Sequence, residues 1–394
     1  MSASPGVCCN RTPASGVTAT TSPSRVPALT GLRAVAALFV VGTHAAFATG
    51  KLAHGYVGSI YAHLEVGVAI FFVLTGFLLL RPWVRAAAAG SAPPNLVRYA
   101  RHRVRRILPA YVLTVLAVFG LYTVFTPGPN PGQTWYGLLR YLTFTEIYTD
   151  DYLITLLHTG LSQTWSLAVE VSFYAVLPAL AYLLLRGGWR PRRILATLAA
   201  LAAITPLWLL ATTAEILPNS AGMWLPAHLA WFAGGMALAV LEATGARCRA
   251  NAAISLAVVL YLAVSTMDTA SAPVTKALTY AAIAALAVAP IALNDSGWYT
   301  TLLSTRPMVW LGEISYEVFL LHVPIMAVTT YLVLRWPLFT GSLPGLLAAT
   351  LALTIPAAWL LQRYAVSRTP IAAAPEAMPT ERGPGVRPSL SPRR

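Results

Sequence analysis

The chain has 394 residues, of which 57% are hydrophobic and only 10% are charged. Soluble domains carry about 25% charged residues, so this chain has too little polar surface to coat a water-soluble globule. Its formal net charge is +14, but the basic residues lie in loops between apolar segments, which does not indicate nucleic-acid binding. The composition therefore predicts an all-α polytopic membrane protein in a cell membrane, with lipids around it and no nucleic-acid partner.

The two ends of the chain differ in composition from the rest. Residues 1–25 are rich in Ser, Thr, Pro and Gly and lack the apolar core of a signal peptide. Residues 367–394 are rich in Pro, Arg and Ala. We interpret both as disordered cytoplasmic tails around a membrane domain at 26–366. The 3 cysteines show neither metal-ligand spacing nor a disulfide framework, so no metal cofactor is expected.

The apolar stretches of the chain are long enough to cross a bilayer many times. A spanning helix needs about 20 mostly apolar residues, and ten stretches come close to this length. The seventh is short and the ninth is long, so each is expected to tilt or break. The ten candidates are residues 29–49, 66–84, 107–125, 166–185, 194–213, 224–243, 252–267, 273–293, 308–334 and 343–363.

The basic residues predict which side of the membrane each loop occupies. Cytoplasmic loops of membrane proteins carry an excess of Lys and Arg. If the N-terminus is cytoplasmic, the only basic residues in the outer loops are Lys51, Arg140, Lys276 and Arg335. The inner loops then hold nearly all the arginines. We therefore expect ten transmembrane helices with the N- and C-termini in the cytoplasm.

The longest predicted external segment is 126–165, which combines prolines with aromatic and acidic residues such as Trp135, Tyr136, Glu146 and Asp150. Aromatic faces and carboxylates suit sugar rings and hydroxyl groups, and loops on a rigid scaffold often carry binding sites. The segment is therefore either a platform for the acceptor substrate or an ordinary surface loop with an aromatic belt.

Two ionisable residues lie on the first predicted span. A charge near the bilayer centre costs at least ~2.5–3.5 kcal/mol, so such residues are functional candidates. Arg33 and His44 are eleven residues apart, which places them on one helix face, about 16 Å from each other. Arginine suits phosphate groups, and histidine can remove a hydroxyl proton near neutral pH. We predict that both line a common cavity, although a snorkelling arginine and a packing histidine are the alternative.

Further charged residues lie near the ends of other spans. Glu170 is expected at about the depth of His44, where its carboxylate would fix the imidazole tautomer; it could instead cap its helix at the interface. Arg103, Arg105 and Arg106 precede the third span. They either anchor the chain to anionic lipid or bind the phosphates of a donor, and both roles can hold at once.

Several residues near these positions in the chain are candidates for binding the substrate. His322 lies within the ninth predicted span and is a second candidate for proton handling or binding, with a polar contact between helices as the alternative. Tyr316 lies on the same span, and Trp165 and Tyr174 lie close to Glu170 in the chain. We predict Trp165, Tyr174, Tyr316 and His322 as substrate contacts, with His44 and Glu170 as catalytic residues.

Five short motifs follow one another along the chain. They are Arg33-x10-His44, FFVLTGFLL at 71–79, RVRRILPAY at 103–111, TWSLAVEVSFY at 164–174 and ISYEVFLLH at 314–322. Together they resemble the acyltransferase-3 family of integral membrane O-acyltransferases over residues 25–365. Thr75 stands where the family commonly has Ser, and Phe319 stands where it usually has Tyr.

The resemblance implies a reaction and its substrates. A short acyl group, often acetyl, would move from cytoplasmic acyl-CoA to a hydroxyl of an envelope glycan, glycolipid, polyketide or macrolide. The histidine matching His44 would be essential, and the arginine matching Arg33 would support the donor. Some relatives carry a C-terminal hydrolase-like domain, which we do not expect here because about 30 residues follow the last span. The oligomeric state stays open.

Two other classes of protein also suit the pattern. A transporter or flippase fits ten spans with buried ionisable groups, but no repeated half is evident and the stripe of Arg33 and His44 has no transport rationale. A noncatalytic scaffold or sensor would leave Arg33, His44 and Glu170 unexplained. For the enzyme, both direct transfer with His44 as base and a covalent acyl-histidine intermediate remain open.

Overall fold

The structure is a computed structural model that describes residues 26–148, 157–267 and 272–366. Within these ranges it consists of helices without any strand, which confirms the all-α class. Both predicted tails, and residues 149–156 of the predicted external segment, lie outside the described residues.

The α-helices are α1 (Pro27–Ala48), α2 (Gly55–His63), α3 (Val66–Ala88), α4 (Leu96–Leu121), α5 (Trp135–Leu142), α7 (Trp165–Leu185), α8 (Pro191–Ala202), α9 (Ile204–Thr213), α10 (Leu225–Ala243), α11 (Ala250–Val264), α12 (Pro273–Ala292), α13 (Trp298–Leu303), α14 (Arg306–Glu313), α15 (Ser315–Val328) and α16 (Leu343–Leu361). Shorter helical turns are η1 (Lys51–Ala53), η2 (Thr159–Thr164), η3 (Asn219–Met223), η4 (Thr329–Val333) and η5 (Gln362–Val366).

Nine helical segments within the described ranges are long and apolar enough to cross a membrane. The multi-pass prediction is confirmed, but the predicted seventh span falls short of this length, since α11 has only 15 residues. The predicted break in the long ninth span is also present, because α14 ends at Glu313 and α15 begins at Ser315. The orientation of the chain in the membrane remains a prediction.

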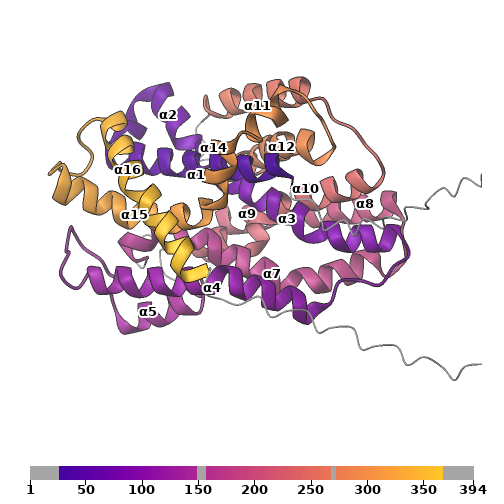
Figure 1. Cartoon of the computed structure of the whole chain (residues 1–394), viewed down its shortest axis with the longest axis horizontal. Coiled ribbons are helices and arrows are strands. Elements are labelled where there is room, and N and C mark those ends of the chain that lie inside the picture. Colours follow the sequence, from indigo (N-terminus) through magenta and orange to yellow (C-terminus); the bar gives the residue numbers. More distant parts are fainter. Residues whose placement is uncertain (1–25, 149–156, 268–271, 367–394) are drawn as a thin grey trace, which may run out of the picture.

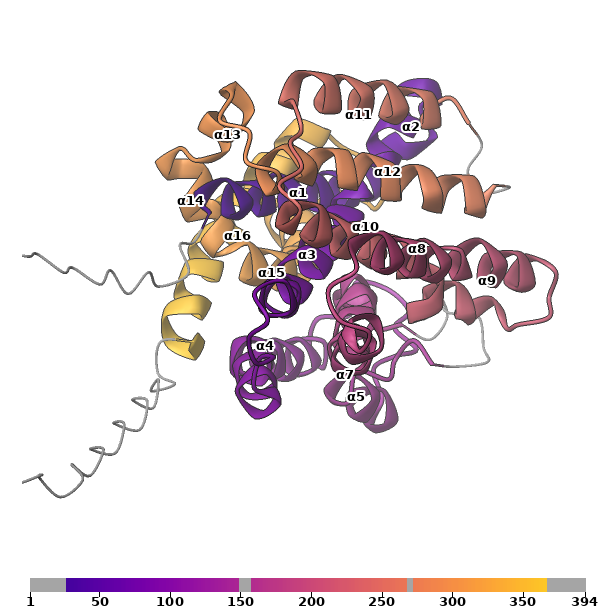
Figure 2. The same cartoon turned by 90° about the vertical axis from the view of Figure 1, so that its right-hand side faces the viewer.

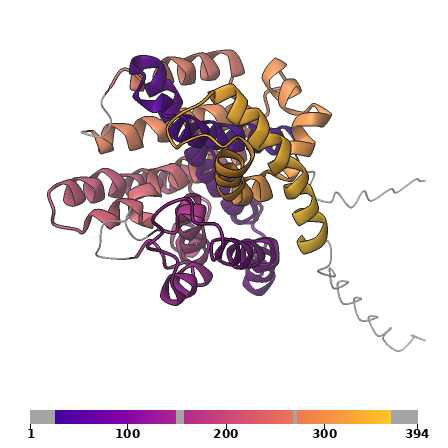
Figure 3. The same ribbon diagram turned by 90° about the vertical axis from the view of Figure 1, so that its left-hand side faces the viewer.

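Helices α1, α3 and α10 occupy the centre of the bundle (Figures 1 and 2). Helix α10 packs against α3 more extensively than any other pair, and α1 contacts α3, α14 and α15. Helices α4, α5 and α7 lie together on one side, and α11 and α12 lie on the opposite side. Helix α16 covers the outer surface of α15, away from α8 and α9 (Figure 3).

Glycines allow α3 and α10 to approach each other closely. A Cβ atom on Gly235 would lie 1.9 Å from the carbonyl oxygen of Val73, and one on Gly76 would lie 2.2 Å from that of Phe232. Lipid tails are as apolar as most side chains, so close packing of small residues is a main source of helix association in membranes. The packing of this pair therefore depends on Gly76 and Gly235, and α3 forms one wall of the cavity described below.

We expect Gly235→Ala to destabilise the folded protein by about 1–3 kcal/mol, because the added methyl group separates α10 from α3. The measurement is the thermal unfolding midpoint of the detergent-solubilised protein. Gly234→Ala is the matched control, since the nearest atom to its Cβ would be 3.8 Å away. Equal midpoints for the two variants would show that the close approach is not required.

Candidate active site

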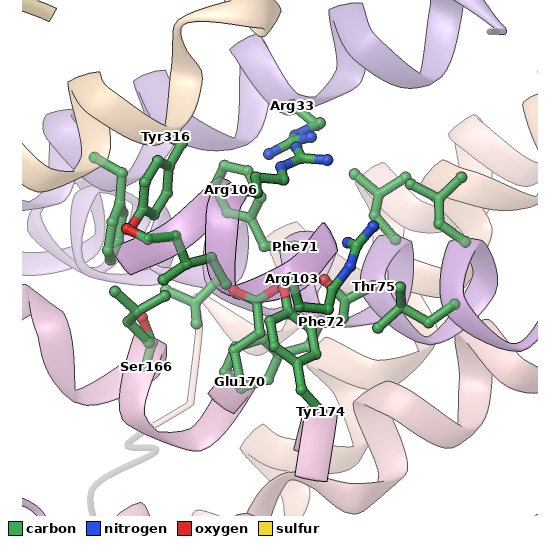
Figure 4. A pocket seen from close by; sticks show the side chains of 17 residues that line it. Arg33, Phe71, Phe72, Thr75, Arg103, Arg106, Ser166, Glu170, Tyr174 and Tyr316 are labelled. Atoms are coloured by element: carbon green, nitrogen blue, oxygen red, sulfur yellow. Dashed lines mark hydrogen bonds between the residues drawn. The ribbon is translucent and has the colours of Figure 1, made fainter. Parts of the chain in front are cut away.

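A cavity that is partly open to the surroundings lies between α1, α3, α4, α7 and α15. Its polar lining comes from residues far apart in the sequence, and phenylalanine and aliphatic side chains complete the wall. Figure 4 shows Arg33 and Arg106 at one end of the cavity and Glu170 at the other, and the guanidinium carbon of Arg103 lies over the ring of Tyr174, 5.9 Å from its centroid. The charged and aromatic polar side chains that line it are Arg33, Arg103, Arg106, Glu170, Tyr174 and Tyr316.

The arginines reach the cavity from two helices. Arg33 comes from α1, and Arg103 and Arg106 come from one face of α4, because residues three apart in a helix are neighbours. Arg105 is two residues from Arg103, so it points to another side of α4 and does not line this cavity. Arg103 Nε is buried and has no hydrogen-bond partner among the described residues. The predicted basic cluster is thus divided between the cavity and the helix surface.

Glu170 is held by hydroxyl groups. Thr75 Oγ1 on α3 donates to Glu170 Oε1 at 2.7 Å, and the hydroxyl of Tyr174, one turn further along α7, donates to the same oxygen at 2.5 Å. No ion pair joins Glu170 to an arginine within the described part of the chain. Glu170 therefore contacts two hydroxyl groups instead of His44. Because Glu170 forms no ion pair with the arginines of the cavity, it does not neutralise their guanidinium groups.

His44 on α1 faces His322 on α15. Their ring centroids are 5.0 Å apart, and His322 Nε2 lies 3.4 Å from His44 Nδ1. His322 is fully buried, whereas His44 is half-buried. Neither imidazole lines the cavity that Arg33 lines, so the structure does not place Arg33 and His44 in one common cavity.

Phenylalanine rings form part of the cavity wall, and one of them also contacts the histidine pair. Phe71 and Phe319 both line the cavity, with their ring centroids 6.4 Å apart. The ring of Phe319 also lies 5.9 Å from that of His322. Phe319 is therefore part of the cavity wall and of the surroundings of the histidine pair, and it connects the arginine end to the imidazole end.

The structure brings together most of the predicted site residues. Tyr316 lines the cavity, and its hydroxyl donates to the carbonyl of Ile107 on α4 at 3.0 Å. Trp165 packs instead against the ring of His228, with centroids 5.3 Å apart, and does not line the cavity. Thr75 was not among the predicted site residues, although its hydroxyl donates a hydrogen bond to Glu170. The only signal for Thr75 was its place in the second motif.

Glu146, in the predicted external segment, is buried rather than part of an exposed acidic platform. Its side chain is 4% exposed, Oε1 accepts a hydrogen bond from Thr164 at 3.3 Å, and Oε2 has no partner among the described residues. Burial raises the pKa of Glu146 from 4.5 to about 8, because desolvation outweighs its hydrogen bonds and the charge of Arg140. By contrast, Trp135 and Tyr136 are exposed.

This buried carboxyl predicts a pH-dependent stability. Because the pKa of Glu146 is higher in the folded protein, its contribution is complete below about pH 4.5 and is lost as pH rises to about 8. The slope is about 1.4 kcal/mol per pH unit within that window. We expect Glu146→Gln to lose this dependence and to melt higher than the wild type at pH 8. Exposed Glu215 is the matched control; identical pH profiles for Glu146→Gln and wild type would contradict the prediction.

An arginine-lined cavity beside a histidine pair, inside a bundle of membrane helices, is the setting expected of a membrane-bound group-transfer enzyme. Comparison with known proteins agrees with this class. The family model described as an acyltransferase domain matches residues 26–363. The chain therefore belongs to the acyltransferase-3 family, and it is an acyltransferase. Membership of this family sets aside the transporter and scaffold alternatives.

Individual relatives are distant but cover much of the chain. Acyltransferase MdmB of Streptomyces mycarofaciens is 28% identical over 89% of this chain and 95% of its own length. The peptidoglycan O-acetyltransferase OatA of Listeria monocytogenes is 25% identical, and the O-acetyltransferase OatA of Staphylococcus aureus is 24% identical. The matched regions cover 77% and 84% of this chain but only 50% and 56% of those two proteins. No solved structure shows a significant match.

Proposed function

We propose that the chain moves a short acyl group, acetyl or similar, from acyl-CoA to a hydroxyl of an envelope glycan, glycolipid, or polyketide or macrolide sugar. The observation that carries this proposal is the connection, through Phe319, between an arginine-lined cavity and a histidine pair. Such an arrangement has one end that suits phosphates and another that suits a reacting hydroxyl.

The cavity supports acyl-CoA as the donor. The donor carries several phosphate charges at one end and an uncharged thioester at the other. Guanidinium groups bind phosphate oxygens through paired, charge-assisted hydrogen bonds. Arg33, Arg103 and Arg106 supply these groups, and the unpartnered Nε of Arg103 is a donor without a protein acceptor. We therefore assign the phosphates to this end.

The histidine pair supports proton removal from the acceptor. His44 would take the proton of the acceptor hydroxyl, whose oxygen then forms a bond to the thioester carbonyl carbon. The carbon–sulfur bond breaks, and CoA leaves as the thiol after regaining a proton from the imidazolium. General-base catalysis of this kind contributes about 10²–10⁴-fold to the rate. A covalent acyl-histidine would differ by a transient acyl group on the protein.

A hydroxyl acceptor is supported by the relatives and by the cavity wall. Two of the relatives are named as O-acetyltransferases, one of them for peptidoglycan. Tyr174 and Tyr316 place aromatic rings along the cavity, and Ser166 adds a buried hydroxyl. We propose these side chains as acceptor contacts; Trp165, which packs against His228 outside the cavity, is not among them.

The test uses purified protein in lipid vesicles with acetyl-CoA and a panel of hydroxyl acceptors. We expect release of free CoA thiol together with an acetyl mass increment on one acceptor class. Mass spectrometry of envelope glycans and lipids from a deletion strain then identifies the natural acceptor by its missing acyl increment. Acyl transfer from a donor other than CoA, with no thiol release from any acyl-CoA, would overturn the proposed donor.

A further inference from the structure

The geometry around His44 carries an inference about the part that His322 plays, and it rests on the proposed function. His44 Nδ1 lies 2.8 Å from the carbonyl oxygen of Val40, one turn earlier on α1. His322 Nδ1 lies 2.8 Å from the carbonyl oxygen of Phe319 and 3.3 Å from that of Val318. His322 Nε2 points at His44 Nδ1, 3.4 Å away. These four contacts decide where the imidazole protons are.

A neutral imidazole has one N–H donor and one acceptor nitrogen, whereas a carbonyl oxygen only accepts. His322 Nδ1 faces carbonyl oxygens only, so it carries the proton, and His322 Nε2 has the lone pair. His44 Nδ1 faces the carbonyl of Val40 and this lone pair, so it also carries its proton. His44 Nε2 is left with the lone pair, and it forms no hydrogen bond to the described residues.

We propose that His322 is a positioning residue that holds His44 in the tautomer whose free nitrogen, Nε2, accepts the proton of the substrate hydroxyl. In this arrangement His322 does for His44 what a carboxylate does for the histidine of a catalytic triad. Its Nε2 accepts from His44 Nδ1–H and stabilises the imidazolium that forms when Nε2 takes up a proton.

The hydrogen-bond acceptor for His44 Nδ1–H is uncharged, which is favourable in the interior of the membrane part. His322 is fully buried in a helix that crosses the membrane, where an ionised carboxylate would be costly. The carboxylate that was expected to orient His44, Glu170, has its hydrogen bonds to Thr75 and Tyr174 instead. His322 is therefore the side chain in contact with His44 that can accept from Nδ1.

The backbone reinforces this orientation. The carbonyl of Phe319 that fixes the His322 tautomer belongs to the residue whose ring lines the arginine cavity. The imidazole pair is thus held by α1 through Val40 and by α15 through Phe319, with both contacts local to their helices. A side chain at position 322 that lacks an acceptor would leave His44 Nδ1–H with Val40 alone, and the ring could rotate away.

Two variants test this role. His322→Leu removes the acceptor, and we expect kcat to fall about 10–100-fold while the KM for acetyl-CoA stays within about twofold, as for loss of a hydrogen bond to a charged group. His322→Gln returns an acceptor oxygen, and most of kcat should return. Unchanged kcat in His322→Leu, or no difference in kcat between folded His322→Leu and folded His322→Gln, would overturn the proposal.

A measurement on the wild-type protein tests the tautomer on which the proposal depends, even if the variants fail to fold. The ¹⁵N chemical shifts of histidine side chains distinguish a protonated Nδ1 from a protonated Nε2, with His44→Ala assigning the signal. We expect the Nδ1–H form for His44, and an Nε2–H form would overturn the inference. This measurement needs no activity, so a failure of the proposed function, seen as no thiol release by wild type, is distinguishable from a failure of this assignment.

Discussion

His44→Ala is expected to reduce acyl transfer by about 10²–10⁴-fold, the range that a positioned general base contributes. The variant removes the proposed general base, but it leaves the arginines of the cavity in place. The KM for acetyl-CoA should therefore change little, because His44 does not line the cavity to which we assign the phosphates. The measurement is steady-state thiol release in vesicles, with the donor concentration varied.

The matched control for this prediction is His54→Ala. His54 is exposed and follows shortly after α1, so its loss removes an imidazole near the same end of the helix without touching the histidine pair. We expect its activity to equal that of the wild type. Full activity in His44→Ala, with normal membrane insertion, would refute the assignment of the base and with it the proposed mechanism.

Removal of an arginine from the cavity is expected to weaken donor binding without changing the chemical step. For Arg33→Ala and Arg106→Ala we expect the KM for acetyl-CoA to rise about 10–100-fold, because a hydrogen bond to a charged group is worth about 1.5–3 kcal/mol. The diagnostic donor is acetyl-pantetheine, which keeps the thioester but lacks the phosphates. Wild type and both variants should use it with similar KM values.

Arg101→Ala is the control for the arginine variants. Arg101 belongs to the same basic segment of α4 and is exposed, as Arg106 is, but it does not line the cavity. If the segment served only to anchor the chain to anionic lipid, Arg101 and Arg106 would have equal effects. A KM for acetyl-pantetheine that rises as much as that for acetyl-CoA would show that the arginines do not recognise the phosphates.

Helix periodicity made part of the site predictable from the sequence. His44 contacts His322 on α15, and Arg33 lines a cavity to which α15 contributes Tyr316 and Phe319, although the two residues do not share one cavity. The same periodicity separates Arg105 from Arg103 by about 200° around α4, whereas Arg106 returns to the side of Arg103. Helix periodicity alone therefore predicts that Arg105 points away from Arg103 and Arg106, whereas we had treated the three arginines as one cluster.

The contacts between helices could not be predicted from the sequence. A period identifies a buried face but not the helix that covers it, so the partner of His44 on α15 and that of Glu170 on α3 required the structure. The lengths of the spans were predictable where apolar residues are continuous. The seventh stretch, expected to be short, is α11 at Ala250–Val264, and with 15 residues it falls below the length of a full span.

Phe319, which lines the arginine cavity and contacts His322, has a consequence for the energy of the reaction. Moving a polyanion into a low-dielectric interior costs tens of kcal/mol unless its charges are compensated. In the proposed function, the phosphates of the donor would stay with the arginines, and only its neutral acyl end would have to pass Phe319, which lines the cavity and lies 5.9 Å from His322. Delivery of an acyl group across part of the membrane would then require no transport of the charged carrier.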